Sequence, residues 1–376
     1  MQEKWRVGIA GYGDRGSHFA KDVWPFVNSP AQVVAVADPN PEARDRARID
    51  IGCEVFEDVE DMLVNVDLNI LIVATHVSLH FDVATIGILY GCHVVCEKPM
   101  AETLARCDGM IQLAQRAGVA LAVHHQSTLS RATAETIRLI RAGAIGDLVS
   151  MAAYGKGRIA CSDLVEIGGH LTDWMRKVFL ATGGGDMVDV FGHVTYKGHP
   201  ITKSDRIWIK LLYPEGRDSG YGAGDRIFGG YTSANGVYAE LHLNELSGAS
   251  STYAEQRAMG YYMDVYGTAG RLRCFLPRVL YLNRSPLDDR TYGRPTEWEE
   301  VNPAFREDRE HVLSRILAED FLRAIEEKRK PVASAEDGRM AIEMTLAGIY
   351  ASHFAGRPLP VPLQDRGDPF RTVSGE

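Results

Sequence analysis

The stretch RVGIAGYGDRG, residues 6–16, runs from a short apolar segment directly into three glycines spaced as G-x-G-x-x-G. The apolar segment predicts a buried strand, and residues 17–26 predict a helix after the glycines. In such a unit Gly11 permits the tight turn, Gly13 lets a phosphate approach the backbone, and Gly16 allows the helix to pack closely. The motif alone is weak evidence, but its position between a strand and a helix favours a dinucleotide-binding turn.

A second strand ends in an acidic residue at the position that such a fold uses for ribose. The run QVVAVA, residues 32–37, leads into Asp38, about 20 residues after the glycines. Asp38 would accept hydrogen bonds from both ribose hydroxyls, and its charge would repel a 2′-phosphate, so the sequence favours NAD as cofactor. Arg44 and Arg46 keep NADP as the less favoured alternative, because either could reach a phosphate near the ribose. A purely structural role for Asp38, opening a turn, stays open.

Strands and helices then alternate along the first third of the chain. Apolar runs predict strands at residues 68–75, 93–97 and 119–125, and helical segments at 78–90 and 104–117 separate them. This alternation predicts a doubly wound parallel α/β sheet over residues 1–125. Ligands of such sheets lie beyond the carboxyl ends of the strands. We therefore expect cofactor contacts from residues that follow strand ends: Gly11, Tyr12, Gly13, Asp14, Arg15, Gly16, Asp38, Thr75, His76, His80, Glu97 and Lys98.

The segment VVCEKPM, residues 94–100, ends an apolar strand with an adjacent acid and base. Desolvating charges is costly unless they meet solvent, a ligand or a partner, so we expect Lys98 to face the bound cofactor. The nearby pair Cys92 and Cys96 brackets His93, but strand alternation puts the histidine on the opposite face from the cysteines. Buried thiols are therefore favoured over zinc, and we predict no metal site.

Length and composition limit the class of protein. A chain of 376 residues, 45% hydrophobic and 24% charged, is suited to two globular domains. A net charge of −9 and a pI near 5.8 argue against nucleic-acid or anionic-lipid partners. No apolar run reaches the roughly 20 residues of a membrane-spanning helix, and the six cysteines show no disulfide framework. We expect a cytoplasmic protein without a leader segment.

The pattern changes at about residue 126. The segment GYTSANGVYAELHLNEL, residues 230–246, alternates apolar and polar residues around glycine-rich turns. Residues 126–376 therefore predict an α+β substrate-binding domain with a large open, mostly antiparallel sheet. We expect helices at 313–327 and 335–355 to cover one face, and the other face to form a homodimer or homotetramer. Residues 357–376 predict an extended arm.

Several motifs together resemble the Gfo/Idh/MocA family, the glucose-fructose oxidoreductase and inositol dehydrogenase group. They are VGIAGYGDRG, ATHVSLH, GCHVVCEKPM, IRAGAIGDL, EIGGHLTD, YGTAGRL and DGRMAIEMTLAGIYASHFAGRPLPVPL. The resemblance spans nearly the whole chain and implies that the lysine of EKP, Lys98, lies at the nicotinamide. The D-x-x-x-H pattern of the family falls on Glu166 and His170, with glutamate in place of the usual aspartate. Asp163 could take over that role, and His76 stands where the family usually has proline.

The resemblance and the residues together indicate hydride transfer. His170 suits a base that removes the hydroxyl proton, Lys98 would stabilise the charge on the same oxygen, and Glu166 would orient the imidazole. Either lysine or histidine could be the formal base. Each residue also has a structural interpretation, since Lys98 could only pair with its neighbour and His170 could only begin a helix. Further donors and acceptors suited to a sugar or polyol are His125, Gln126, Lys156, Arg158, Asp163 and Asp173.

The sequence is compatible with three functions. We favour an NAD-dependent oxidoreductase that oxidises a secondary alcohol of a sugar, sugar derivative or cyclitol. A second interpretation is a transient redox enzyme that retains its NAD, such as a sugar isomerase, epimerase or glycoside-cleaving eliminase. A third is a sugar-sensing regulator that binds a dinucleotide without catalysis. The presence of both Lys98 and His170 argues against the regulator.

Overall fold

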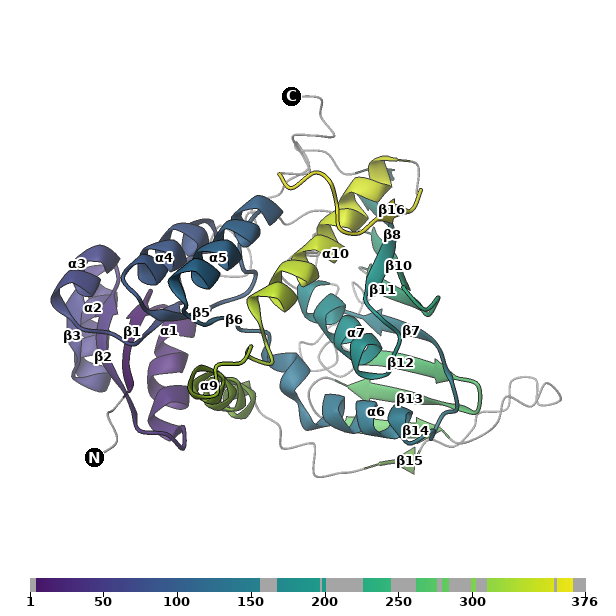
Figure 1. Cartoon of the computed structure of the whole chain (residues 1–376), viewed down its shortest axis with the longest axis horizontal. Coiled ribbons are helices and arrows are strands. Elements are labelled where there is room, and N and C mark those ends of the chain that lie inside the picture. The colour runs from purple at the N-terminus through teal and green to yellow at the C-terminus, as the bar shows by residue number, and fades with distance from the viewer. Residues whose placement is uncertain are drawn as a thin grey trace. The chain divides into compact units, whose positions relative to one another are not determined.

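A computed structural model describes residues 5–155, 168–196, 198–200, 226–244, 262–275, 279–283, 299–301, 310–354 and 357–367. The chain divides into two compact units. The first comprises Met1–Gln126 together with Glu310–Arg339, and the second comprises Ser127–Arg309 together with Met340–Glu376. Each unit is built around its own sheet (Figure 1).

The first unit contains a six-stranded sheet in the order β3-β2-β1-β4-β5-β6, with every neighbouring pair parallel. Strand β4 is buried along its whole length and β5 is buried after His93, because helices pack on both faces. The strands are β1 (Trp5–Ala10), β2 (Ala31–Ala37), β3 (Glu54–Phe56), β4 (Ile70–Val73), β5 (His93–Cys96) and β6 (Leu121–Val123). Strand order reverses between β1 and β4, the crossover that creates a ligand site in such sheets.

Local sequence explains the helices of this unit. Pro41 occupies the first turn of α2, and the side chain of Asn40 accepts a hydrogen bond from Glu42 N. Thr103 caps α5, which ends at Gly118 in the left-handed conformation. The helices are α1 (Asp14–His18), the π turn η1 (Phe19–Val23), the 3₁₀ turn η2 (Trp24–Phe26), α2 (Pro41–Ile51), α3 (Val59–Asn65), α4 (Val77–Leu89), α5 (Leu104–Ala117) and α9 (Glu310–Glu326).

Helix α9 belongs to the first unit although it lies late in the chain. It packs against η1 and η2, and Figure 1 shows it on the side of the sheet opposite α4 and α5. Its Glu319 accepts a hydrogen bond from the side chain of Asn28 (2.6 Å), and Arg315 donates to the Asp22 carbonyl (2.7 Å). The prediction that residues 313–327 cover the second sheet is therefore wrong. An apolar stripe indicates that a helix is packed, but not which sheet it covers.

The second unit contains a ten-stranded, mostly antiparallel sheet with the main order β15-β14-β13-β12-β7-β11-β10-β8-β16, while β9 pairs with β8. Only β7 and β11 pair in parallel among these described strands. The strands are β7 (Leu148–Tyr154), β8 (Met187–Tyr196), β9 (His199–Pro200), β10 (Arg226–Ser233), β11 (Tyr238–Asn244), β12 (Tyr262–Gly267), β13 (Gly270–Phe275), β14 (Val279–Asn283), β15 (Glu299–Glu300) and β16 (Leu359–Pro360).

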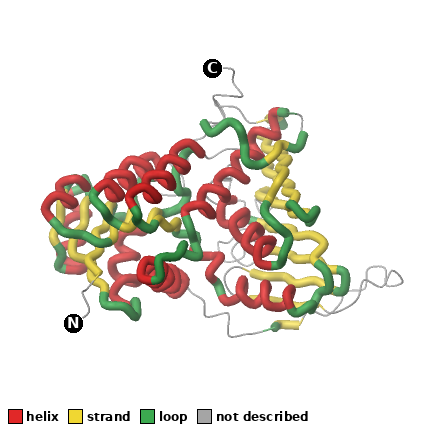
Figure 2. The backbone as a smooth tube through the Cα atoms, in the orientation of Figure 1, coloured by secondary structure: helices red, strands yellow, loops and turns green. Residues whose placement is uncertain are grey.

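Helices cover one face of the second sheet (Figure 2). They are α6 (Arg131–Arg141), α7 (Gly169–Ala181) and, from Met340 on, α10 (Ala335–His353), and the short turn η3 (Gln126–Leu129) precedes α6. The contact with α10 is close, since a Cβ on Gly192 of β8 would lie 2.1 Å from the Gly348 carbonyl oxygen. Strand residues that point toward the helices, such as Leu241 and Val265, are fully buried.

The architecture confirms the predicted fold class, a parallel doubly wound domain followed by an α+β domain with a large mixed sheet. Two elements are additions to the prediction, the short strand β3 and the helix α3. The helix predicted for residues 17–26 begins earlier, at Asp14, and passes through the π turn. Among the described helices, none combines the length and apolar character needed to cross a membrane.

Candidate active site

The glycine turn between β1 and α1 has no room for a Cβ at Gly11 or at Gly16. A Cβ on Gly16 would lie 1.9 Å from the Gly11 carbonyl oxygen, so the helix can start this close to the strand only with glycine there. Gly11 adopts a φ of +89°, and a Cβ on it would lie 2.6 Å from the Ala74 carbonyl oxygen. The glycines thus keep the backbone of this turn close to the carboxyl end of β1, which suits a phosphate group.

Asp38 is held at the end of β2 and points toward this turn. Its Oδ2 accepts a hydrogen bond from Tyr12 N (2.7 Å), and its Oδ1 accepts one from Asn40 N (2.8 Å). These bonds fix the carboxylate and leave further lone pairs for ligand hydroxyls. The side chain of Tyr12 is buried, and its hydroxyl donates to Asp50 (3.1 Å), so the Tyr12 backbone is the part that reaches Asp38.

The two nearby arginines have protein partners. Arg44 donates to the carbonyl oxygens of Asp38 (2.8 Å) and Pro39 (2.9 Å) and lies 3.6 Å from a carboxylate oxygen of Glu57. Arg46 lies 3.4 Å from the Tyr12 carbonyl oxygen, underneath the glycine turn. Arg44 thus supports the loop that carries Asp38, and Arg46 contacts the glycine turn.

The turn after β4 contains three of the predicted contact residues. Thr75 is half-buried, and His76 is exposed at the start of α4. His80 is buried, and its ring nitrogens lie 2.8 Å from the Pro99 carbonyl oxygen and 3.1 Å from that of Thr75. Burial lowers the pKa of His80 from its ordinary value, against the opposing effect of these carbonyls. His80 therefore ties the β4 turn to the β5 turn.

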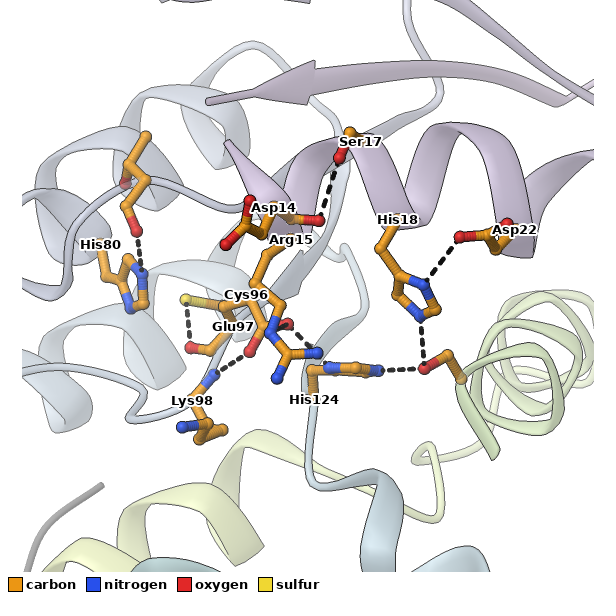
Figure 3. A network of polar contacts seen from close by, with 12 residues as sticks. Asp14, Arg15, Ser17, His18, Asp22, His80, Cys96, Glu97, Lys98 and His124 are labelled. Carbon is orange, nitrogen blue, oxygen red and sulfur yellow. Dashed lines mark hydrogen bonds and ion pairs between the residues drawn. The ribbon is translucent and has the colours of Figure 1, made fainter. Parts of the chain in front are cut away.

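Glu97 lies at the centre of a polar cluster at the carboxyl end of β5 (Figure 3). Its Oε2 accepts the backbone N–H of Lys98 (3.0 Å), its Oε1 lies 2.9 Å from His124 Nδ1, and Arg15 Nε lies 4.0 Å from Oε1. Burial opposes ionisation of this carboxyl, but His124, Arg15 and Lys98 outweigh burial and hold its pKa well below the usual range. Lys98 itself is half-buried.

Sequence analysis did not assign a role to His124, which proves to be the main partner of Glu97. A signal for it was present, because β5 and β6 are parallel neighbours with Cys96 opposite Val123, so the next residues, Glu97 and His124, lie side by side. The second partner of His124, Ser314, could not be predicted from strand pairing. His124 Nε2 lies 3.0 Å from the Ser314 hydroxyl, which α9 supplies from 190 residues further along the chain.

The two cysteines that bracket His93 lie in and beside β5. Cys92 and Cys96 are buried thiols, and burial raises the pKa of Cys92 to about 11. The Nδ1 of His93 accepts a hydrogen bond from Ala120 N (2.9 Å). Among the residues that the structure describes, no group of three or more His, Cys, Asp or Glu side chains is placed to hold a metal ion.

The remaining predicted residues belong to other parts of the chain. His125 is buried directly after His124, and Gln126 begins η3. His170 and Asp173 lie in the first turns of α7 in the second unit, where Asp173 is buried and His170 half-buried. Four further predicted residues lie outside the described residues: Lys156, Arg158, Asp163 and Glu166.

The carboxyl edge of the first sheet fits a dinucleotide. It brings together a tight glycine turn and a fixed carboxylate at the end of the next strand, the two features that bind pyrophosphate and ribose in this kind of sheet. In agreement, residues 5–125 match the sequence profile described as an oxidoreductase family with an NAD-binding Rossmann fold, Gfo/Idh/MocA. Over these residues, the chain is similar to the Gfo/Idh/MocA family of oxidoreductases.

Two curated relatives extend the similarity. The chain is 26% identical over 298 residues to a 1,5-anhydro-D-fructose reductase of Ensifer adhaerens, a match that covers 78% of this chain and 80% of the relative. It is 26% identical over 187 residues to a scyllo-inositol 2-dehydrogenase (NADP(+)) of Bacillus subtilis. That second match covers 46% of this chain and spans about half, 51%, of the relative.

A solved structure confirms the fold over both units. A levoglucosan dehydrogenase in complex with NADH superimposes with a TM-score of 0.75, covering 96% of this chain and all of that one, 100%. Its sequence identity to this chain is 20%. The two-domain architecture is therefore shared at low sequence similarity.

Proposed function

We propose that this protein is a member of the Gfo/Idh/MocA family and an NAD-dependent oxidoreductase that oxidises a secondary alcohol of a sugar, sugar derivative or cyclitol, or catalyses the reverse reduction. One observation carries the proposal. Arg15, which follows the glycine turn, lies 4.0 Å from Glu97, and Glu97 accepts the backbone N–H of Lys98, which supports a role for Lys98 beside the dinucleotide site. The relatives' names, a reductase of an anhydrosugar and an inositol dehydrogenase, support the substrate class.

Lys98 would act on the substrate oxygen. Its ammonium stabilises negative charge on the hydroxyl oxygen as the hydride leaves the neighbouring carbon, which is electrostatic catalysis by a preorganised group. The nicotinamide, when bound, accepts that hydride. His170 would take the hydroxyl proton, as the family resemblance implies, because an imidazole exchanges protons near neutral pH.

We propose NAD rather than NADP as the cofactor. The carboxylate of Asp38 is fixed by two backbone N–H groups at the ribose end of the site, where it repels a 2′-phosphate. Arg44, which could have bound that phosphate, instead supports the loop through Asp38 and Pro39. Equilibrium binding of NADH and NADPH to the purified protein tests this, and tighter binding of NADPH would contradict it.

Absorbance at 340 nm on a panel of sugars and cyclitols tests the activity. We expect NADH release with at least one compound, and a fall in kcat of at least about a hundredfold in Lys98→Ala. Lys330→Ala is the matched control, because the ammonium of Lys330 is exposed and pairs with Glu336. NADH binding without turnover of any compound would contradict the proposal, and so would full activity of Lys98→Ala.

The open face of the second sheet supports a homo-oligomer. A row of aromatic rings crosses it, with Tyr154 stacked on His242 (5.0 Å between centroids) and on Tyr262 (4.7 Å), and Phe275 beside Tyr262 (5.6 Å). These rings are half-buried in a single chain. We propose that two or more copies associate through this row, since half-buried aromatic residues are common at the centre of interfaces. We also propose that the protein acts in the cytoplasm.

A further inference from the structure

Five side chains form a continuous chain of polar contacts from the buried Glu97 to the surface (Figure 3). Glu97 Oε1 lies 2.9 Å from His124 Nδ1, and His124 Nε2 lies 3.0 Å from Ser314 Oγ. The same hydroxyl lies 3.2 Å from His18 Nε2, and His18 Nδ1 lies 3.2 Å from Asp22 Oδ2. Exposure of the side chains rises along the chain, from 5% for Glu97 and 1% for His124 to 16% for His18 and 54% for Asp22.

The chain is assembled from three distant segments of the first unit. His18 and Asp22 belong to α1 and η1, Glu97 and His124 follow β5 and β6, and Ser314 comes from α9. The hydroxyl of Ser314 is buried and joins the two histidines. Phe19 packs edge-on against the His124 ring at 4.8 Å between centroids, which restricts the orientation of the imidazole. Each group is thus held in line with the next.

All donors and acceptors of the chain are satisfied when every hydrogen bond between His18 and Glu97 is donated toward Glu97. With both carboxylates ionised, His18 doubly protonated donates Nδ1–H to Asp22 and Nε2–H to Ser314 Oγ. Ser314 then donates its hydroxyl proton to His124 Nε2, and His124 donates Nδ1–H to Glu97. His124 is neutral in this arrangement.

A second arrangement, in which each group has passed one proton to the next, also satisfies every donor and acceptor. If Glu97 receives the Nδ1 proton of His124, His124 takes the Ser314 proton at Nε2, and Ser314 takes the Nε2 proton of His18. His18 becomes neutral and still donates Nδ1–H to Asp22, while every other contact reverses its donor. One positive charge on His18 and one negative charge on Glu97 disappear together, so protons and charge balance.

We propose that this chain, Asp22–His18–Ser314–His124–Glu97, carries the proton of the redox reaction between the dinucleotide site and solvent. The inference rests on the proposed function, because oxidation of an alcohol to a carbonyl releases one proton for each hydride transferred. Glu97, next to Lys98, receives that proton at the inner end only after the base has removed it from the hydroxyl in the oxidation direction, and it supplies the proton to that base in the reduction direction. The other four groups are positioning residues that act through Glu97.

The charges around Glu97 favour loss of its proton after each turnover. Arg15 and Lys98 face Glu97, and the buried His80 lies close enough to interact with it electrostatically. At the outer end, Arg315 of α9 donates to the Asp22 carbonyl (2.7 Å). The cationic groups near Glu97 favour return of its proton to His124 once the reaction has passed.

Turnover in Ser314→Ala tests the proton path with the substrate that the NADH assay identifies. We expect kcat to fall about tenfold or more at low buffer concentration, the KM for NAD to stay unchanged, and added imidazole to restore the rate. His18→Gln, at the half-buried outer end, should behave in the same way if Ser314→Ala folds poorly. Ser334→Ala is the control, because its hydroxyl caps α10 through Asp337 and should leave kcat and its buffer dependence unchanged.

A kcat for Ser314→Ala and His18→Gln equal to that of the unmodified protein would overturn the proton path, as would a loss that imidazole does not restore. A second measurement does not depend on turnover. In the full chain labelled with ¹⁵N-histidine, neutral His124 should carry its proton on Nδ1. The ¹⁵N chemical shifts of the His124 ring should change when His18 gains or loses a proton, and Ser314→Ala should abolish that change. A proton on Nε2 of neutral His124, or titrations without linkage in the unmodified protein, would overturn the inference even if the protein had no alcohol substrate.

Discussion

The two sheets of this protein place their polar residues in different ways. In the first, β4 is buried throughout and β5 is buried after His93, and the buried polar side chain of Glu97 comes directly after β5 ends. In the second, strands alternate, so that Leu241 faces the helices while its neighbour His242 joins the aromatic row. A parallel sheet covered on both faces can carry chemistry only at its edge, whereas the second sheet carries a row of half-buried aromatic rings on one face.

The largest effect should come from filling the bare turn at the edge of the first sheet. In Gly16→Ala the new Cβ would lie 1.9 Å from the Gly11 carbonyl oxygen, so the turn must move away from the position that binds phosphate. We expect NADH affinity, measured by fluorescence titration, to fall by more than about a hundredfold. In the control Gly118→Ala, the Cβ would meet nothing within 4 Å, although φ is +69° there. Equal NADH affinities in the two variants would contradict phosphate binding by the glycine turn.

The second effect concerns the buried carboxylate of the first unit. Glu97→Gln removes the ionised partner of His124, and we expect the free energy of unfolding at pH 7 to fall by about 2 kcal/mol. Because the folded-state pKa of Glu97 is lowered, its stabilisation is present above the ordinary glutamate pKa, about 4.3. The stabilisation should disappear as pH falls through the folded-state pKa.

Urea unfolding at several pH values from neutral downward measures this difference. The matched control is Glu102→Gln, which breaks a more exposed pair with Arg106 and should change stability by less than about 1 kcal/mol. A difference between Glu97→Gln and the unmodified protein that grows toward low pH would contradict the assigned ionisation state.

The third effect concerns the aromatic face of the second sheet. Tyr154→Ala removes the ring at the centre of the row, which stacks on His242 and Tyr262. We expect the dissociation constant of the oligomer, measured by analytical ultracentrifugation, to rise about tenfold, while NADH affinity stays unchanged. Leu89→Ala on the first unit, where the side chain is 70% exposed, is the control and should alter neither quantity. A protein that sediments as a monomer before substitution would contradict the proposed interface.

The smallest effect should be confined to the helix-covered side of the second sheet. The hydroxyl of Ser352 in α10 accepts Val194 N and donates to the Val194 carbonyl, both at 3.0 Å. Ser352→Ala should lower the free energy of unfolding by about 1 kcal/mol without changing NADH binding or assembly. A change in NADH affinity would show that the two units are coupled more strongly than the comparison implies.

The sequence predicted most of the first unit because its strands are apolar runs and its turns carry glycine. The position of Glu97 and Lys98 followed from the same reasoning, since residues after buried parallel strands share one edge. Strand β3 was missed because three residues, Glu54–Phe56, give too short a pattern to recognise.

Other features depended on contacts between segments far apart in the chain. Helix α9 was placed on the wrong sheet because an amphipathic period does not identify the surface that it covers. The Ser314 contact was missed because it joins β6 to a helix 190 residues later. His124 was only partly predictable. Its position after β6 followed from the sequence, but its contact with Glu97 required the register of β5 and β6.

The most direct test of the central claim, that the chemistry occurs at the carboxyl edge of the first sheet, is a crystal structure with bound NADH. The account predicts the pyrophosphate on the turn of residues 11–16, the adenosine ribose hydroxyls on Asp38, and the nicotinamide ring beside the Lys98 ammonium. A nicotinamide bound away from Lys98, or a pyrophosphate elsewhere than on the glycine turn, would contradict it.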